Sequence, residues 1–182
     1  GAALAAAAAF LSAPLPNAHF HLNNVEPALA FFSLMSLFFF LEWTGERRTA
    51  ALALSAVFCG FAMSVKLTGA AHLAVMAAFV AASSRKEGFA AALREIALFF
   101  ALALLVVSPW LLKSWIWTGN PVWPFLHSVF GGANWSETNA RDYQFYLRHY
   151  FGTPTMKSWA ATPLELMRRG GMDNIGAALP AL

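Results

Sequence analysis

Two charged residues stand out because each lies at the edge of a long apolar run. Glu26 comes just before Pro27 and the run 28–41, and Lys66 follows the uncharged run 49–65. A carboxylate in this position could orient an acceptor or ligate a divalent cation, and it also favours the positive end of a helix. A lysine ammonium there could bind a lipid-linked phosphate, or could extend from a helix end to the membrane surface. For each residue both interpretations stay open.

Other polar residues lie near this pair in the sequence. Thr68 and the Gly69 backbone could add hydrogen-bond donors beside Lys66. His19 and His21 could bind a metal together with Glu26, but hard divalent cations prefer oxygen ligands. A divalent cation is therefore the cofactor that we consider here, and no other is predicted.

The segment 108–125, SPWLLKSWIWTGNPVWPF, is rich in aromatic residues. It contains Lys113 and four tryptophans, which are Trp110, Trp115, Trp117 and Trp123. Tryptophan favours the headgroup level of a bilayer, so we expect the chain to leave the membrane here, with Pro109 ending a long apolar helix. The segment is either an interfacial helix and turn or a substrate-facing loop.

The composition of the whole chain is that of a membrane protein. Of its 182 residues 59% are hydrophobic and 12% are charged, and the mean hydropathy is +0.55. Soluble domains carry about 25% charged residues. The single cysteine, Cys59, cannot form an internal disulfide. No glycine-rich phosphate loop or nucleic-acid motif occurs, so we expect the lipid bilayer, and no nucleic acid, as a partner.

The apolar runs predict an all-α fold, a polytopic bundle of transmembrane helices over residues 1–108. Helices are expected near 1–13, 27–43, 49–65, 70–83 and 88–108. The turns on one side of this bundle hold Arg47, Arg48, Arg85, Lys86 and Arg94, whereas the short connectors on the other side hold Lys66 alone. By the positive-inside rule the basic turns are cytoplasmic, and Glu26 and Lys66 lie on the outer side.

Residues 109–180 predict an extracytoplasmic region that is helical rather than a flexible linker. The spacing of aromatic residues predicts a helix over 141–150, and Thr162 before Pro163 predicts another over 162–169. We expect both to pack over the outer ends of the bundle. The apolar ends of the chain, 1–13 and 175–182, look like parts of further spanning helices, so we expect a piece of a longer protein.

Three segments resemble the GT-C superfamily of integral-membrane glycosyltransferases. NVEPALAFFSLMSLFFFLEW is similar to a family helix that starts with an acidic residue, and AMSVKLTG to a helix end with Lys followed by Thr. SPWLLKSWIWTGNPVWPFLHSVFGG is the most specific segment. It resembles the Pro-Trp, Gly-Asn-Pro, Pro-Phe and Gly-Gly pattern of bacterial members related to the protein O-mannosyltransferases and the lipid A aminoarabinose transferase. The likeness covers about residues 20–182.

This resemblance implies transfer of a sugar from a polyprenyl-phosphate carrier to an acceptor, at the outer face of the bacterial inner membrane. The residues that we predict for substrate binding are Glu26, Lys66, Thr68, Trp110 and Asn120. The family's catalytic carboxylate lies in a first outer loop that would precede Gly1, so no catalytic residue is expected within this chain. The alternative is a non-catalytic transmembrane subunit that packs with other membrane proteins in a larger complex.

Overall fold

The computed structural model describes residues 4–5 and 24–151, and in these ranges every regular element is a helix. In chain order the elements are α3 (Glu26–Glu46), α4 (Thr49–Val65), α5 (Gly69–Ser84), the 3-10 turn η1 (Arg85–Glu87), α6 (Phe89–Thr118), α7 (His127–Phe130) and α8 (Glu137–Phe151). The predicted all-α fold is thus confirmed for the described part. The chain forms two compact units, of which one spans Val25–Trp135 and the other includes α8.

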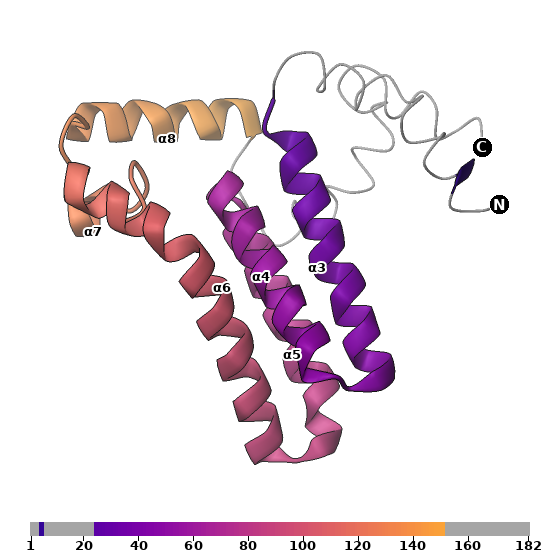
Figure 1. Ribbon diagram of the computed structural model, residues 1–182. Helices are drawn as coiled ribbons and strands as arrows, with labels where there is room; N and C mark the ends of the chain where they lie inside the picture. Colours follow the sequence, from indigo (N-terminus) through magenta and orange to yellow (C-terminus); the bar gives the residue numbers. More distant parts are fainter. Residues whose placement is uncertain (1–3, 6–23, 152–182) are drawn as a thin grey trace. The chain divides into compact units, whose positions relative to one another are not determined.

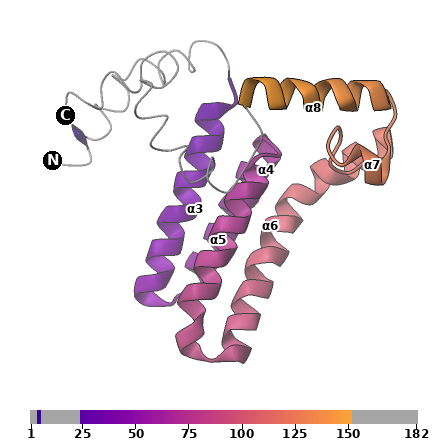
Figure 2. The same ribbon diagram turned by 180° about the vertical axis from the view of Figure 1, so that it is seen from behind.

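Helices α3 to α6 run side by side in alternating directions (Figures 1 and 2). α4 lies in the middle of this bundle and packs against α3, α5 and α6. Its buried side is made largely of small residues, and a Cβ on Gly60 would come within 2.6 Å of the Ala103 carbonyl oxygen on α6. Small residues allow helix backbones to approach closely, as they do in membrane bundles.

The bundle has an apolar core that includes Trp43 and Phe99, but it also buries serines and exposes many large apolar side chains. Ser36 and Ser55 are fully buried between α3 and α4, where the Ser55 hydroxyl donates to the Ser36 carbonyl oxygen at 2.8 Å. The outer face of α3 exposes Phe31, Leu34, Phe38 and Leu41, each by more than half. In addition, α3 and α6 are long and apolar enough to cross a bilayer. These features indicate that the protein associates with a membrane.

Helix boundaries follow the local sequence. α3 begins at Glu26 with Pro27 in its first turn, where the missing N–H of proline costs no hydrogen bond. α6 ends before Gly119, whose φ of 75° is left-handed and whose N–H donates to the Trp115 carbonyl oxygen at 2.8 Å. The starts and ends of α3, α4 and α5 agree with the predicted 27–43, 49–65 and 70–83 to within one turn.

The prediction that Pro109 ends its helix is wrong. α6 continues through Pro109 to Thr118, and the upper part of α6 diverges from α4 in both views (Figures 1 and 2). A proline inside a helix leaves the carbonyl four residues earlier without its N–H donor, here that of Leu105. The Ser108 hydroxyl donates to that carbonyl oxygen at 2.8 Å, which replaces the missing bond. The neighbouring serine therefore allows the helix to continue.

Later in the chain, α8 confirms the helix predicted over 141–150 and begins somewhat earlier, at Glu137. The helices predicted over 1–13 and 162–169 lie outside the described residues, apart from a helical Leu4 and Ala5. The predicted packing of α8 over the bundle stays a prediction.

Candidate functional site

Glu26 and Lys66 meet at one end of the bundle. α3 begins at Glu26, and the antiparallel α4 ends before Lys66, whose backbone is extended with φ −153° and ψ 131°. The Lys66 Nζ donates to Glu26 Oε1 at 2.8 Å, and the two side chains remain 45% and 42% exposed. This contact confirms that both residues lie at the same end, while Arg47 follows the opposite end of α3.

This ion pair is accessible and has one short contact, which limits its strength. Exposed ion pairs contribute about 0–1 kcal/mol, because water screens the charges and two flexible side chains are ordered. A ligand with more negative charge than one carboxylate could therefore displace Glu26 from Lys66. Lys66 is thus held at the surface by a weak ion pair with Glu26, which occupies the position that an anionic ligand could take.

The turn that follows Lys66 is tightly hydrogen bonded. The Gly69 N–H donates to the Lys66 carbonyl oxygen at 2.8 Å, so it is not available as the donor that the sequence suggested. The Thr68 side chain is exposed and makes no capping hydrogen bond to α5. Of the two predicted donors beside Lys66, Thr68 alone keeps a polar group that could reach a ligand.

Asn120 organises the loop that follows α6. It is fully buried, and its Nδ2 donates to the carbonyl oxygens of Phe125 at 2.9 Å and Gly131 at 3.0 Å. Its Oδ1 accepts from the Val122 N–H at 2.9 Å. Because the side chain is enclosed and bonded at both ends, it does not present its amide to a substrate. The prediction of direct substrate contact by Asn120 is replaced by a positioning role in the loop.

Trp110 lies on α6 in a helical segment and not in a loop, which favours the interfacial-helix interpretation of 110–118. The Lys113 Nζ lies 4.6 Å from the ring centre of Trp110 and 4.9 Å from that of Trp117. We call these three residues the Trp–Lys–Trp face. Among the contacts between described residues, none joins Lys66 to Trp110 or Asn120. Contact of Trp110 with a substrate stays a prediction.

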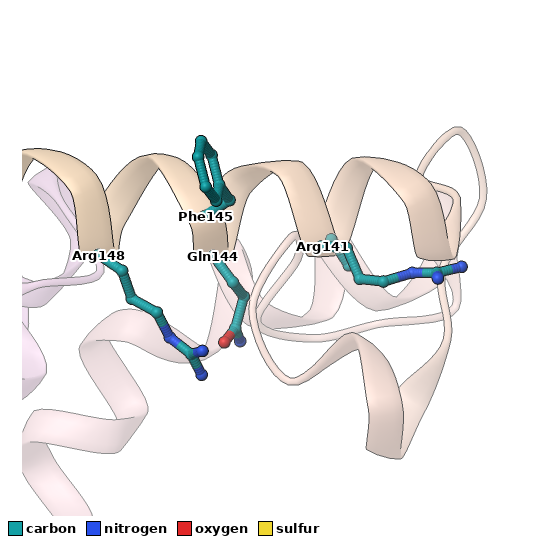
Figure 3. A pocket seen from close by; sticks show the side chains of 5 residues that line it. Arg141, Gln144, Phe145 and Arg148 are labelled. Carbon is teal, nitrogen blue, oxygen red and sulfur yellow. The ribbon is translucent and has the colours of Figure 1, made fainter. Parts of the chain in front are cut away.

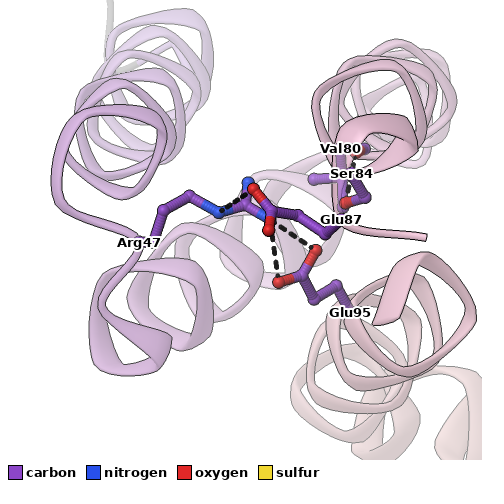
Figure 4. A network of polar contacts seen from close by, with 5 residues as sticks. All are labelled: Arg47, Val80, Ser84, Glu87 and Glu95. Atoms are coloured by element: carbon purple, nitrogen blue, oxygen red, sulfur yellow. Dashed lines mark hydrogen bonds and ion pairs between the residues drawn. The ribbon is translucent and has the colours of Figure 1, made fainter. Parts of the chain in front are cut away.

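The opposite end of the bundle is closed by a second, denser charge cluster (Figure 4). The Arg47 Nη2 donates to both carboxylate oxygens of Glu95 at 3.0 Å, and Arg47 Nε lies 3.7 Å from Glu87. The guanidinium also lies 4.0 Å above the ring of the buried Trp43. This cluster ties the α3–α4 turn to η1 and α6, so it fixes the bundle at this end.

The side of α8 carries a shallow hollow lined by Ala140, Arg141, Gln144, Phe145 and Arg148 (Figure 3). Arg141 lies 4.0 Å from Glu137 in an ion pair whose side chains are 77% and 87% exposed. Such exposure is typical of a solvated helix face.

The described residues contain no group of three or more His, Cys, Asp or Glu side chains arranged to hold a metal ion. His19 and His21, which the sequence suggested as metal ligands, lie outside the described residues. The divalent cation at Glu26 stays a prediction.

The family described as Domain of unknown function (DUF8201) matches residues 26–153, which is more than half of the chain. The chain belongs to this family. The matched range begins at Glu26 and includes α3 to α8, so the Glu26–Lys66 pair and the Trp–Lys–Trp face both lie within the family domain. No curated protein and no solved structure matches the chain.

Proposed function

We propose that this chain is the membrane-embedded part of a GT-C-type glycosyltransferase, which takes a sugar from a polyprenyl-phosphate carrier at the outer face of the bacterial inner membrane. The proposal is supported by the sequence pattern of 108–132 and by the apolar exterior of the bundle. The observation that carries it is the Glu26–Lys66 pair, which holds an accessible ammonium at the end of two apolar helices.

In this proposal α3 to α6 are four successive membrane crossings. α4 and α5 have 17 and 16 residues, so they would span about 25 Å at 1.5 Å per residue, less than the ~30 Å hydrocarbon core. Local thinning of the bilayer accommodates such short helices. The end with Arg47, Arg48, Arg85, Lys86 and Arg94 is then cytoplasmic by the positive-inside rule, and the Glu26–Lys66 pair faces outward.

The carrier would bind by exchanging one anion for another at Lys66. A phosphate monoester or diester replaces the Glu26 carboxylate on the Lys66 ammonium, and the exposed Thr68 hydroxyl donates a further hydrogen bond. The Glu26 carboxylate, no longer bonded to Lys66, then orients the acceptor. The exposed apolar surface of the neighbouring helices provides contacts for the prenyl chain.

The test is carrier affinity of the purified full-length protein in detergent. Lys66→Ala removes a hydrogen bond to a charged group, worth about 1.5–3 kcal/mol, so polyprenyl-phosphate binding should weaken roughly tenfold to a hundredfold. Lys66→Arg should keep part of the affinity. Lys86→Ala removes an exposed lysine at the opposite end and serves as the matched control. Equal affinity of wild type and Lys66→Ala would contradict the proposal.

Release of free polyprenyl phosphate from a polyprenyl-phosphate sugar then tests the transfer itself. The alternative, a non-catalytic subunit, is favoured by one observation: Lys66 already has a protein counter-ion, as expected of a contact that only fastens α3 to α4. Carrier binding without any sugar release by the full-length protein would support that alternative.

A further inference from the structure

The Trp–Lys–Trp face has a geometry of its own near the end of α6. Trp110, Lys113 and Trp117 are spaced by three and four residues, so they share one face of the helix. The Lys113 Nζ lies 4.6 Å and 4.9 Å from the two ring centres, while Trp110 is 53% and Trp117 is 72% exposed. The two indoles therefore hold the ammonium at the surface by cation–π attraction rather than leaving it free to move.

The positive charge of Lys113 is not neutralised within the described part of the chain. The segment 110–135 contains no Asp or Glu, and none of the described carboxylates lies within ion-pair distance of Lys113. At the same end of the bundle Lys66 is paired with Glu26. The Trp–Lys–Trp face is thus complementary to an anion, whereas the Lys66 position already contains one.

The surroundings of this charge are apolar. Leu112 and Ile116, which lie beside Lys113 on the helix surface, are 53% and 71% exposed. An anion that is joined to an apolar body would therefore fit this surface. Tryptophan favours the headgroup level of a bilayer, and basic residues at that level attract anionic lipids.

We propose that the Trp–Lys–Trp face binds the headgroup phosphate of an anionic phospholipid, with the indoles at headgroup level and Leu112 and Ile116 against the acyl chains. This inference rests on the membrane-spanning part of the proposed function and is independent of sugar transfer. It assigns a lipid site to α6 that is separate from the carrier site at Lys66.

The experiment uses the full-length protein, delipidated in a non-ionic detergent and titrated with phosphatidylglycerol, with bound lipid counted by native mass spectrometry. Lys113→Gln should weaken binding about tenfold, the scale of one lost hydrogen bond to a charged group. Lys113→Arg should bind as the wild type does. Lys86→Gln, which changes an exposed lysine at the other end of the bundle, should also leave binding unchanged.

A second variant tests the indoles. The double substitution Trp110→Leu with Trp117→Leu keeps the face apolar but removes both rings, and it should weaken phosphatidylglycerol binding several-fold. Wild-type binding in this variant would overturn the role given to the two tryptophans.

Comparison of ligands identifies what is recognised. Phosphatidylcholine, which has the same phosphate but no net charge, should bind more weakly and should not respond to Lys113→Gln. Inorganic phosphate should not compete, because it lacks the acyl chains. Equal binding of the two lipids, or an undiminished affinity of Lys113→Gln for phosphatidylglycerol, would overturn the proposal.

Lys66→Ala separates this inference from the proposed carrier site. It should leave phosphatidylglycerol binding intact while lowering polyprenyl-phosphate binding. Loss of phosphatidylglycerol binding in Lys66→Ala, with none in Lys113→Gln, would move the lipid site to Lys66 and reject the inference.

Discussion

An ion pair joins two helices at each end of the bundle, but the two pairs differ in burial and in the number of hydrogen bonds. At one end Arg47 bonds both oxygens of Glu95, and the two side chains are only 29% and 14% exposed. At the other end Lys66 makes one bond to Glu26, and both side chains are exposed by more than 40%. The planar guanidinium of Arg47 is held in place because its Nη2 bonds both Glu95 oxygens while its Nε faces Glu87. A lysine on a flexible stem can exchange partners more easily.

One end of this bundle is therefore fixed by charge contacts, and the other end presents its charges to solvent. We call the Arg47 end the fastened end and the Glu26–Lys66 end the available end. The fastened end also has Trp43 beneath Arg47, which adds a cation–π contact to a site already shielded from water. The available end has an open ion pair and the exposed Trp–Lys–Trp face. We therefore expect ligands to bind at the available end, where the ion pair contributes little to stability.

The largest effect on stability is expected for Arg47→Ala. The substitution leaves the mostly buried Glu95 carboxylate without its partner, and it should cost about 2–4 kcal/mol in the free energy of unfolding. The measurement is reversible unfolding in mixed micelles. Arg48→Ala, whose exposed ion pairs join Glu42 and Glu46, is the control and should change stability by less than about 1 kcal/mol. Equal effects of the two substitutions would show that the fastened end is not special.

Packing near the available end gives the next largest effect. A Cβ on Gly60 would come within 2.6 Å of the Ala103 carbonyl oxygen, so Gly60→Ala should separate α4 from α6 and cost about 1–3 kcal/mol. Gly45 lies in the last turn of α3, near the fastened end, and has no atom within 4 Å of a Cβ. Gly45→Ala should be neutral or slightly stabilising in the same unfolding assay. A stable Gly60→Ala protein would mean that the helices do not approach so closely.

The smallest effect on stability is expected for Glu26→Gln. Because the pair with Lys66 is exposed, its loss should change the free energy of unfolding by no more than about 1 kcal/mol. The same substitution frees Lys66, so polyprenyl-phosphate affinity should rise, by up to about fivefold if the whole pair energy is recovered. Titration of carrier lipid into both proteins measures this. A lower affinity in Glu26→Gln would show that Glu26 assists binding rather than competing with it.

The sequence predicted the helices well because their signal is local. Apolar runs bounded by charged turns located α3, α4 and α5 to within one turn. The end of α6 was missed because proline was treated as a break, although Ser108 could bond the carbonyl that Pro109 leaves without a donor. A serine directly before an interior proline was the available signal.

The site was predicted in part. Glu26 and Lys66 were predicted on the same side because Glu26 begins one helix and Lys66 ends the next, antiparallel helix, and the contact at 2.8 Å agrees. Glu95 was not recognised as the partner of Arg47, because the contact joins residues far apart in the chain. The positioning role of Asn120 was also missed, because the sequence does not show whether an asparagine side chain is buried or exposed.

The loop after α6 is closed at its base. The Ala133 N–H donates to the Thr118 carbonyl oxygen at 2.8 Å, and Asn120 bonds both Phe125 and Gly131 within the closed segment. Because its two ends meet, the loop can change in length or sequence between homologous chains without moving the end of α6. Variation among relatives should then concentrate inside this loop, while Thr118, Asn120 and Gly131 keep its closure.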